Sequence, residues 1–404
     1  MESVDPPGGM STIVETRPEP PAAPPVAPPP AAPRRSSRVP IIVAVSAALI
    51  GLGLLGQQFL STTLYEQLWL RLTSAEAHLT ETIDDYERVL DRSSSAAARA
   101  DALEAVVGGD LVTPEAVEGL RADAAELRSV LESAPAPTGP LTGRFEDPAE
   151  FAPAWDRYAD AIAMAEALPA RDATIDAFDD AASDIADARQ AVIDRTDEVF
   201  AVALEHAEAE IAAHPLATYR TTLDLRHLID GGGVDGQSMS ASGFTALTDA
   251  VTALRASHAA VEAAHAEYPV RAEIEAFARS IAQGVTLDFA WAYEVAGMPS
   301  DGWYAGTAQF WPEDGGWGLI TLSYSIDEAW GDENATAVVV HEVGHTQAIR
   351  ESCTPIFEGP EFNGDHEMWA TAWAIGRGYD LPGAGIEMYG RPSDAQIAAA
   401  AQCR

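Results

Sequence analysis

The sequence predicts a mostly α-helical protein with an α+β domain at its C-terminal end, preceded by a transmembrane helix and a helical bundle or stalk. Three observations predict this organisation. No charged residue occurs from Val39 to Tyr65, which is long enough for one membrane-spanning helix. Residues 62–268 are rich in Ala, Glu, Asp, Leu and Arg and contain few strand signals. Seven of the nine tryptophans lie between Trp291 and Trp373, so the main compact core is expected there.

The chain is strongly acidic, and its charge argues against one class of partner. Its 404 residues carry a formal net charge of −39, and all 24 basic residues are arginines. Contacts to phosphates need clustered cations, and no such cluster occurs outside the N-terminal segment, so we expect no nucleic-acid partner. The acidity instead fits a solvated helical surface.

Residues 1–38 are predicted to form a disordered cytoplasmic tail. Proline and alanine dominate this segment, including the run Pro28-Pro29-Pro30. A segment of this composition adopts extended polyproline conformations and has too little apolar surface to fold.

Residues 39–61 are predicted to be an uncleaved transmembrane signal anchor. Glu66 is the first charged residue after the apolar run, whereas three arginines lie just before it, namely Arg34, Arg35 and Arg38. The positive-inside rule then places the N-terminus in the cytoplasm and everything after residue 65 outside it, as in a single-pass protein of the cell membrane. A cleavable signal peptide is the alternative, but no small-x-small site follows Leu55.

Residues 62–268 are expected to form an extracytoplasmic region of several long helices, packed as a bundle or a stalk. Thr113 followed by Pro114 is typical of a helix start, and breaks are expected at Ala134–Gly143 and at Gly231–Gly233. We also expect this helical region to offer a surface for self-association. Its six histidines show no spacing typical of metal ligands.

Residues 269–404 are predicted to form the α+β domain. A helix is expected over Val270–Gln283, followed by a strand over Val285–Val295 in which every second residue is apolar. Trp303–Trp311 and Gly318–Asp327 are further strand candidates. The last of these has one apolar face, as a half-buried strand would. That face comprises Ile320, Leu322, Tyr324 and Ile326.

The five residues 341–345, with the sequence HEVGH, carry the strongest functional signal in the chain. Positions four apart share one face of a helix, so His341 and His345 can present two imidazoles to one metal ion. Glu342 can then take a proton from a water molecule beside that ion.

A helix from about residue 333 to 350 is expected to carry this motif. Asp332 can cap its start, and Glu333 in the first turn favours the helix dipole. Gly344 costs such a helix about 1 kcal/mol relative to Ala. A close-packed neighbour, or the metal site itself, would explain the glycine.

A zinc site with two histidines needs a third protein ligand. The metzincin pattern would place Gly at 348 and His at 351, but this chain has Ala348 and Glu351 there. His366 would complete a site of three histidines without any family spacing, and Glu361 is a weaker candidate. Glu367 follows the second histidine by 22 residues, which suits a ligand from a second helix.

The pattern His341-Glu342-x-x-His345, followed by Glu367-x-x-Ala, resembles gluzincin-type zinc metallopeptidases of the membrane-anchored bacterial type. The resemblance covers the chain from the predicted strands to the C-terminus, and HExxH is its more specific part. It implies a zincin-like fold for residues 269–404. It also implies one Zn²⁺ per chain held by His341, His345 and Glu367, with Glu342 as the general base.

One position departs from the family pattern. Relatives often carry Asp four residues after the ligand Glu, where it orients a zinc-bound histidine. This chain has Thr371 there, so Asp365 becomes a candidate for that role. His366 and Tyr389 are candidates for stabilising the transition state.

The two cysteines, Cys353 and Cys403, both fall in the C-terminal domain. Free thiols would be expected in the cytoplasm, whereas outside it a disulfide between them is the better prediction. The bond would close a loop of about 50 residues and stabilise the fold by about 4 kcal/mol in the chain-entropy model.

These predictions favour a membrane-anchored extracytoplasmic zinc peptidase that hydrolyses peptide bonds in a peptide or protein substrate. If the family logic holds, the strand Ile320–Ile326 would be the edge that pairs with an extended substrate. The alternative is a non-catalytic envelope spacer or interaction protein with a degenerate zinc-binding module. The intact Glu342 favours the enzyme, because a module that keeps zinc only for stability has no need of it.

Overall fold

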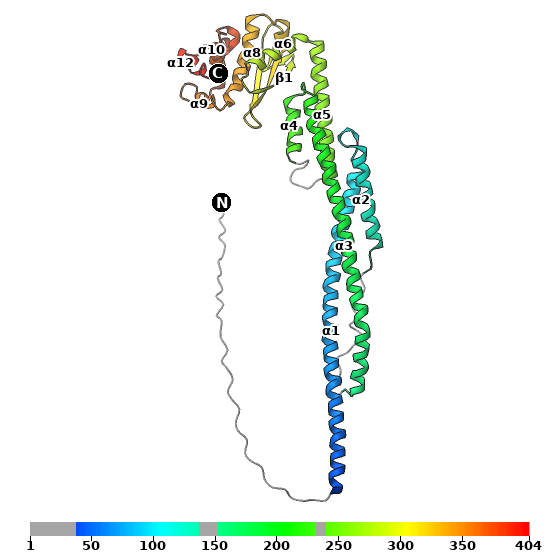
Figure 1. Ribbon diagram of the computed structural model, residues 1–404. Helices are drawn as coiled ribbons and strands as arrows, with labels where there is room; N and C mark the ends of the chain where they lie inside the picture. Colours follow the sequence, from blue (N-terminus) through cyan, green and yellow to red (C-terminus); the bar gives the residue numbers. More distant parts are fainter. Residues whose placement is uncertain (1–37, 137–151, 232–239, 404) are drawn as a thin grey trace, which may run out of the picture. The chain divides into compact units, whose positions relative to one another are not determined.

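The structure is a computed structural model that describes residues 38–136, 152–231 and 240–403 (Figure 1). For residues 38–48 and 50 it describes the backbone alone. The predicted N-terminal tail therefore lies outside the described residues, except for the backbone of Arg38.

Helices dominate the described chain and one small sheet lies in its C-terminal part, which confirms the mostly helical fold class predicted from the sequence. The helices before the sheet are α1 (Arg38–Glu104), η1 (Gly109–Leu111), α2 (Pro114–Ser133), α3 (Ala154–Ala213), α4 (Tyr219–Asp230), α5 (Ala241–Glu267) and α6 (Pro269–Ile281). Those after it are α7 (Tyr324–Glu328), α8 (Glu333–Thr346), η3 (Gln347–Ile349), α9 (Thr354–Phe357), α10 (His366–Gly376), η4 (Pro382–Ala384), α11 (Ile386–Tyr389) and α12 (Asp394–Ala400).

The chain divides into two compact units. The first combines Met1–Trp69 with Asp147–Ala163, and the second combines Leu70–Glu146 with Met164–Arg404. Both long helices, α1 and α3, therefore contribute residues to each unit.

In the first unit, the start of α3 packs along α1. The Gln58 side chain donates a hydrogen bond to the Ala152 carbonyl at 3.0 Å, and the Arg157 guanidinium donates to the Thr62 hydroxyl. Several apolar side chains of α1 are nevertheless exposed, namely Leu49, Leu52, Leu54, Leu55, Phe59 and Leu60.

A search of the described residues finds no helix whose length and hydropathy suit a membrane crossing. The side chains at positions 39–48 and 50 of the predicted anchor lie outside the described part of the chain. The anchor at residues 39–61 therefore stays a prediction.

In the second unit, α1, α2 and α3 pack through small apolar clusters. Leu79 and Tyr86 of α1 meet Phe178 and Ile185 of α3, and the ring centroids of Tyr86 and Phe178 are 5.0 Å apart. A further cluster joins α1, α2 and α3 to α4 and α5 through Leu103, Leu120, Phe200, Leu225, Phe244 and Leu247. The predicted helix start at Thr113 is confirmed, since its side chain accepts a hydrogen bond from the Ala116 amide.

The C-terminal sheet has three strands in the order β1-β5-β4. β1 (Thr286–Ala292) runs parallel to β5 (Trp317–Ser323), and β4 (Gly306–Trp311) runs antiparallel to β5. The short strands β2 (Glu294–Val295) and β3 (Met298–Pro299) form a separate hairpin.

Two predictions about the last strand are wrong. β5 is the central strand and not an edge, because β1 pairs with one side of it and β4 with the other. The strand also ends at Ser323, after which α7 begins. Alternation over only two further residues, Tyr324 and Ile326, is too short to establish a strand, and an ion pair between Asp327 and Arg271 links the α7 turn to α6.

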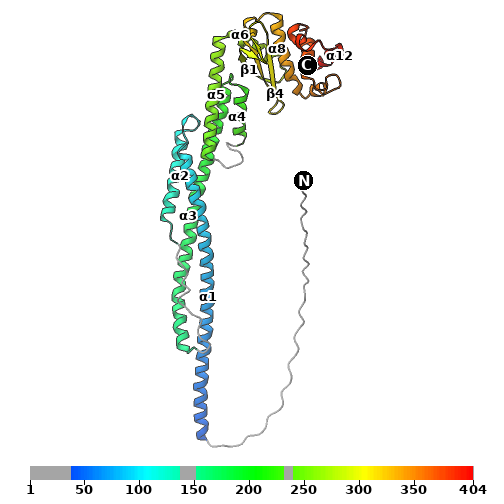
Figure 2. The same cartoon turned by 180° about the vertical axis from the view of Figure 1, so that it is seen from behind.

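Helix α8 packs on the sheet and α10 packs against α8 (Figure 1; seen from behind in Figure 2). Buried apolar side chains of these elements form one core, including Leu322 from β5, Val339 and Val340 from α8, and Trp369 and Trp373 from α10. Trp369 and Trp373 are the two largest fully buried side chains among the described residues, so they contribute much of the apolar area buried in this core.

A disulfide joins Cys353 to Cys403, with their Cα atoms 5.1 Å apart. Cys353 lies just before α9, and Cys403 follows α12, so the bond fastens the last helix to the segment that leaves α8. Both sulfurs are buried, and the indole of Trp373 donates a hydrogen bond to the Cys403 carbonyl at 3.2 Å.

We expect Cys403→Ser to lower the free energy of unfolding by about 4 kcal/mol, because the bond closes a loop of 50 residues. The measurement is thermal unfolding of the full chain followed by circular dichroism. Gln402→Ala, an exposed neighbour, should leave the transition unchanged. An unfolding temperature for Cys403→Ser equal to that of the control would show that the bond does not hold α12 in place.

Candidate metal centre and active site

Helix α8 presents the two histidines of the HEVGH sequence. It begins where the Asp332 carboxylate accepts a hydrogen bond from the Asn334 amide at 2.7 Å. His341 and His345 lie one helical turn apart and are both buried, 5% and 7% exposed. Buried imidazoles need partners for their ring nitrogens.

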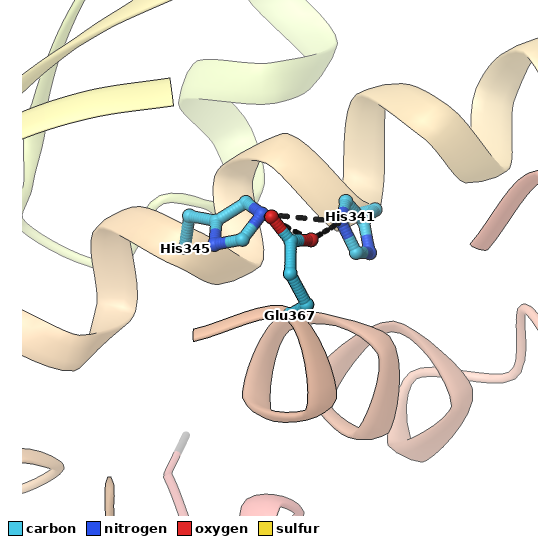
Figure 3. Close-up of side chains that lie close together, drawn as sticks. All are labelled: His341, His345 and Glu367. Atoms are coloured by element: carbon cyan, nitrogen blue, oxygen red, sulfur yellow. Dashed lines mark hydrogen bonds and ion pairs between the residues drawn. The ribbon is translucent and has the colours of Figure 1, made fainter. Parts of the chain in front are cut away.

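Helix α10 brings Glu367 to the histidines, as Figure 3 shows. The Asp365 side chain caps this helix by accepting a hydrogen bond from the Met368 amide at 3.1 Å. Glu367 therefore lies in the first turn of α10, from which its carboxylate extends to α8. The sequence prediction of Glu367 as the third member of the group agrees with this geometry.

The three candidate ligand atoms lie at distances that suit a zinc ion. The Glu367 Oε2 atom is 3.3 Å from Nε2 of His341 and 3.3 Å from Nε2 of His345, and the two nitrogens are 3.1 Å apart. Tetrahedral zinc with bonds of about 2.0–2.1 Å holds its ligand atoms about 3.3 Å from one another. These three residues are the candidate metal-binding group found among the described residues.

The His341 ring is held from behind by a main-chain carbonyl. Its Nδ1 donates a hydrogen bond to the Ala384 oxygen at 2.9 Å, and the Thr371 hydroxyl lies 3.4 Å from the same nitrogen. With the proton on Nδ1, the lone pair of Nε2 is free for a metal. Ala384 thus fills the orienting role that we expected from Asp365, which instead caps α10.

Gly385 makes room for this arrangement. Its φ is +94°, and a Cβ atom there would lie 2.4 Å from the Thr371 hydroxyl oxygen and 2.8 Å from Cε1 of His341. A larger residue would displace the ring that faces the metal position.

Glu342 is buried beside the two histidines with one oxygen free. Its Oε2 atom has no hydrogen-bond partner among the described residues, although the side chain is only 5% exposed. Burial raises the pKa of the carboxyl above its ordinary value, while His341 and His345 oppose that rise. A buried oxygen without a partner is costly unless a water or a substrate group completes it.

The start of β4 lies directly against Glu342. A Cβ atom on Gly306 would be 2.5 Å from Cγ of Glu342 and 2.8 Å from its carboxyl carbon. Only a residue without a side chain allows the strand to come so close. The sequence patterns alone gave no indication of Gly306.

The ionisation states of His345 and Glu367 depend on each other and on the groups around them. Burial raises the pKa of Glu367, but the adjacent His341 and His345 side chains outweigh that effect and hold its pKa well below the ordinary range. Burial lowers the pKa of His345, and the Glu367 and Glu342 carboxylates together more than reverse this, so the net shift is upward. The carboxylate is therefore ionised and faces two imidazoles, as a metal site requires.

Tyr389 and His366, the two predicted transition-state residues, lie in different surroundings. The Tyr389 ring stacks on His341 with centroids 5.9 Å apart, and burial together with the Glu367 charge raises its pKa to about 12. His366 lies near Phe357 and Phe310, at centroid distances of 4.6 and 5.4 Å, and is absent from the ligand group. Burial lowers the pKa of His366.

No protein-family model, curated protein or solved structure matches this chain.

We expect the purified chain to bind about one zinc ion, measured by inductively coupled plasma mass spectrometry after dialysis. His341→Ala combined with His345→Ala should remove stoichiometric zinc, because two of the three ligands are lost. His78→Ala changes an exposed histidine of α1 and should leave the zinc content unchanged. Full zinc occupancy in the double variant would exclude this cluster as the metal site.

Proposed function

We propose that this protein is a zinc-dependent peptidase of the gluzincin type, with a zincin-like domain over residues 269–404. The observation that carries the proposal is the spacing of 3.1–3.3 Å among the ligand atoms of His341, His345 and Glu367, beside a buried Glu342 whose Oε2 has no partner among the described residues. When bound, Zn²⁺ would supply a Lewis acid that polarises the scissile carbonyl and acidifies a water molecule.

Glu342 acts as the general base in this proposal. It accepts a proton from the attacking water and later donates it to the leaving amine. Its raised pKa, caused mainly by burial, suits a group that must both take and return a proton. The free Oε2 atom is the position from which it would contact the water.

Tyr389 is the proposed donor to the oxyanion. Its pKa of about 12 keeps the hydroxyl protonated at neutral pH, so it can donate a hydrogen bond to a developing negative charge. Stacking on His341 holds the ring beside the metal position.

The substrate is proposed to bind along β4, since the sheet order leaves one side of this strand unpaired. The Ser323 amide donates to the Ala305 carbonyl, so hydrogen-bonded pairs continue at every second residue of the antiparallel ladder. The main-chain groups of Gly306, Ala308 and Phe310 then face away from β5. An extended peptide can pair with them in the manner of an added strand.

The proposed location is the outer side of a cell membrane, with the N-terminus in the cytoplasm and an anchor at residues 39–61. Two observations support it. Six apolar side chains of α1 between Leu49 and Leu60 are exposed, which is typical of a helix that contacts lipid. The disulfide between Cys353 and Cys403 suits an oxidising compartment.

The second candidate is a non-catalytic envelope spacer or interaction protein with a degenerate zinc-binding module. The great length of α1 and α3, with 67 and 60 residues, favours such a role for the helical region. The buried carboxylate of Glu342, whose Oε2 has no partner among the described residues, argues against it. Such a group destabilises the fold, and a purely structural zinc site would have no use for it.

We expect Glu342→Gln to retain zinc and the fold but to lose about 100- to 10,000-fold in peptide hydrolysis, because the change removes a base and not a ligand. The measurement is cleavage of a quenched fluorescent peptide library by the full chain, with zinc content determined on the same samples. Glu333→Gln, an exposed change in the first turn of α8, serves as the matched control.

Equal hydrolysis by Glu342→Gln and the wild type would remove Glu342 from the reaction. If the zinc-loaded wild type cleaves no member of a broad library, the non-catalytic candidate becomes the better account.

A further inference from the structure

Helix α4 belongs to the helical region in sequence, yet it contacts the sheet that carries the proposed substrate strand. The Asp288 carboxylate of β1 accepts hydrogen bonds from the amides of Tyr219 and Arg220, at 2.6 and 3.0 Å. These amides form the first turn of α4, so a residue of the sheet caps a helix of the preceding region. Asp288 is buried, which makes this cap part of the core.

The same helix also holds the tip of the β4–β5 hairpin. The Tyr219 hydroxyl donates a hydrogen bond to the Asp314 carbonyl at 2.9 Å, and Nε2 of His227 lies 2.8 Å from the Asp314 carboxylate. Asp314 has a φ of +55°, followed by Gly315 and Gly316 with φ of +86° and +81°. Three consecutive residues in the left-handed region, one of them not glycine, make a strained turn that depends on surrounding contacts.

Aromatic rings continue the contact from α4 to the end of β4. The Tyr219 ring lies 6.1 Å from the Trp317 ring, which stacks on Trp311 at 4.1 Å. Trp311 is the last residue of β4 and Trp317 is the first residue of β5, so the stacked rings involve both strands of the hairpin. At the opposite end of β4, Gly306 lies against Glu342.

We propose that Tyr219 and His227 of α4 are positioning residues for the substrate strand: they fix the tip of the β4–β5 hairpin and thereby set how well β4 accepts a peptide. This inference rests on the proposed function. It gives the helical region a regulatory role, because any movement of α4 changes the ordering of the strand that binds substrate. The physical reason is that an edge strand has a ladder on one side only, so its far end depends on contacts outside the sheet.

Charge makes the contact sensitive to pH. The hydrogen bond and charge of Asp314 raise the pKa of His227 above 6.5, and the nearby Asp224 and Asp230 on α4 raise it further. A raised pKa means that protonated His227 is favoured by the contact, so the contact is strongest below pH 6.5 and weakens as pH rises through the raised value.

The first measurement is hydrogen–deuterium exchange of the hairpin in the full chain, expressed as protection factors. Tyr219→Phe combined with His227→Ala should lower protection of residues 306–323 by about tenfold, since two hydrogen bonds are lost. Arg226→Ala, an exposed change on the same helix, should have no effect. Unchanged protection in the double variant would overturn the proposed contact.

The second measurement separates KM from kcat on a peptide that the wild type cleaves. The double variant should raise KM by about tenfold with kcat nearly unchanged, because the strand binds substrate but takes no part in proton transfer. His227→Lys with Tyr219 retained keeps the positive charge, so it should hold KM at the wild-type value. It should also remove the rise of KM that the wild type is expected to show as pH increases above 6.5.

The outcomes distinguish this inference from the function on which it rests. Lower hairpin protection with an unchanged KM would overturn the positioning role while leaving the peptidase intact. A wild type that cleaves no peptide would overturn both.

Discussion

The close contact between α8 and α10 is the constraint on which the site depends. A Cβ atom on Gly344 would be 3.0 Å from the Ala370 carbonyl oxygen and 3.2 Å from the Trp373 ring. The α8 backbone at this residue therefore packs directly against α10. The Trp369 indole donates a hydrogen bond to the Gly344 carbonyl at 2.9 Å, which fixes the relative position of the helices. Glu367 lies two residues before Trp369, and it reaches His341 and His345 because of this packing. The glycine that weakens α8 as an isolated helix therefore makes the ligand geometry possible.

Two more glycines allow a similarly close approach of other elements to the site. Gly306 lets β4 approach Glu342, and Gly385 lets the turn after η4 approach His341 and Thr371. At Gly306 and Gly385 a Cβ atom would meet a residue of the site at 2.5 Å or less, and at Gly344 it would meet the Ala370 main chain at 3.0 Å. Backbone thus lies close to the cluster at three positions, and this explains how the buried His341, His345 and Glu342 keep fixed distances.

The sequence predicted those features that depend on local spacing. Positions four apart on one helix bring His341 and His345 together, and capping residues at Asp332 and Thr113 mark helix starts that the structure confirms. The position of Glu367 followed from its distance along the chain. The order of strands did not follow, because periodicity reveals a buried face but not which strands are neighbours. The resemblance to gluzincins predicted Ile320–Ile326 as the edge strand, whereas β5 lies at the centre of the sheet.

The orienting partner of His341 could not have been found from residue types, because it is the main-chain carbonyl of Ala384 and any residue could supply it. The contact between α4 and the hairpin is similarly hidden, since Tyr219, His227 and Asp314 lie far apart in sequence and match no common motif. Long-range contacts of this kind depend on how the helical region returns to the sheet, which a linear pattern does not encode.

In the proposed zinc site, metal binding and helix packing would form one equilibrium. Two imidazole nitrogens 3.1 Å apart and a carboxylate 3.3 Å from each form a compact group of acceptors, and protons alone satisfy such a group poorly. A cation held by these three residues would favour the close approach of α10 to α8. Because the same approach buries Trp369 and Trp373, the free energy of metal binding would then add to the stability of the core. The close packing at Gly344 would in turn hold the three side chains near their bound positions, so less ordering would be required on binding.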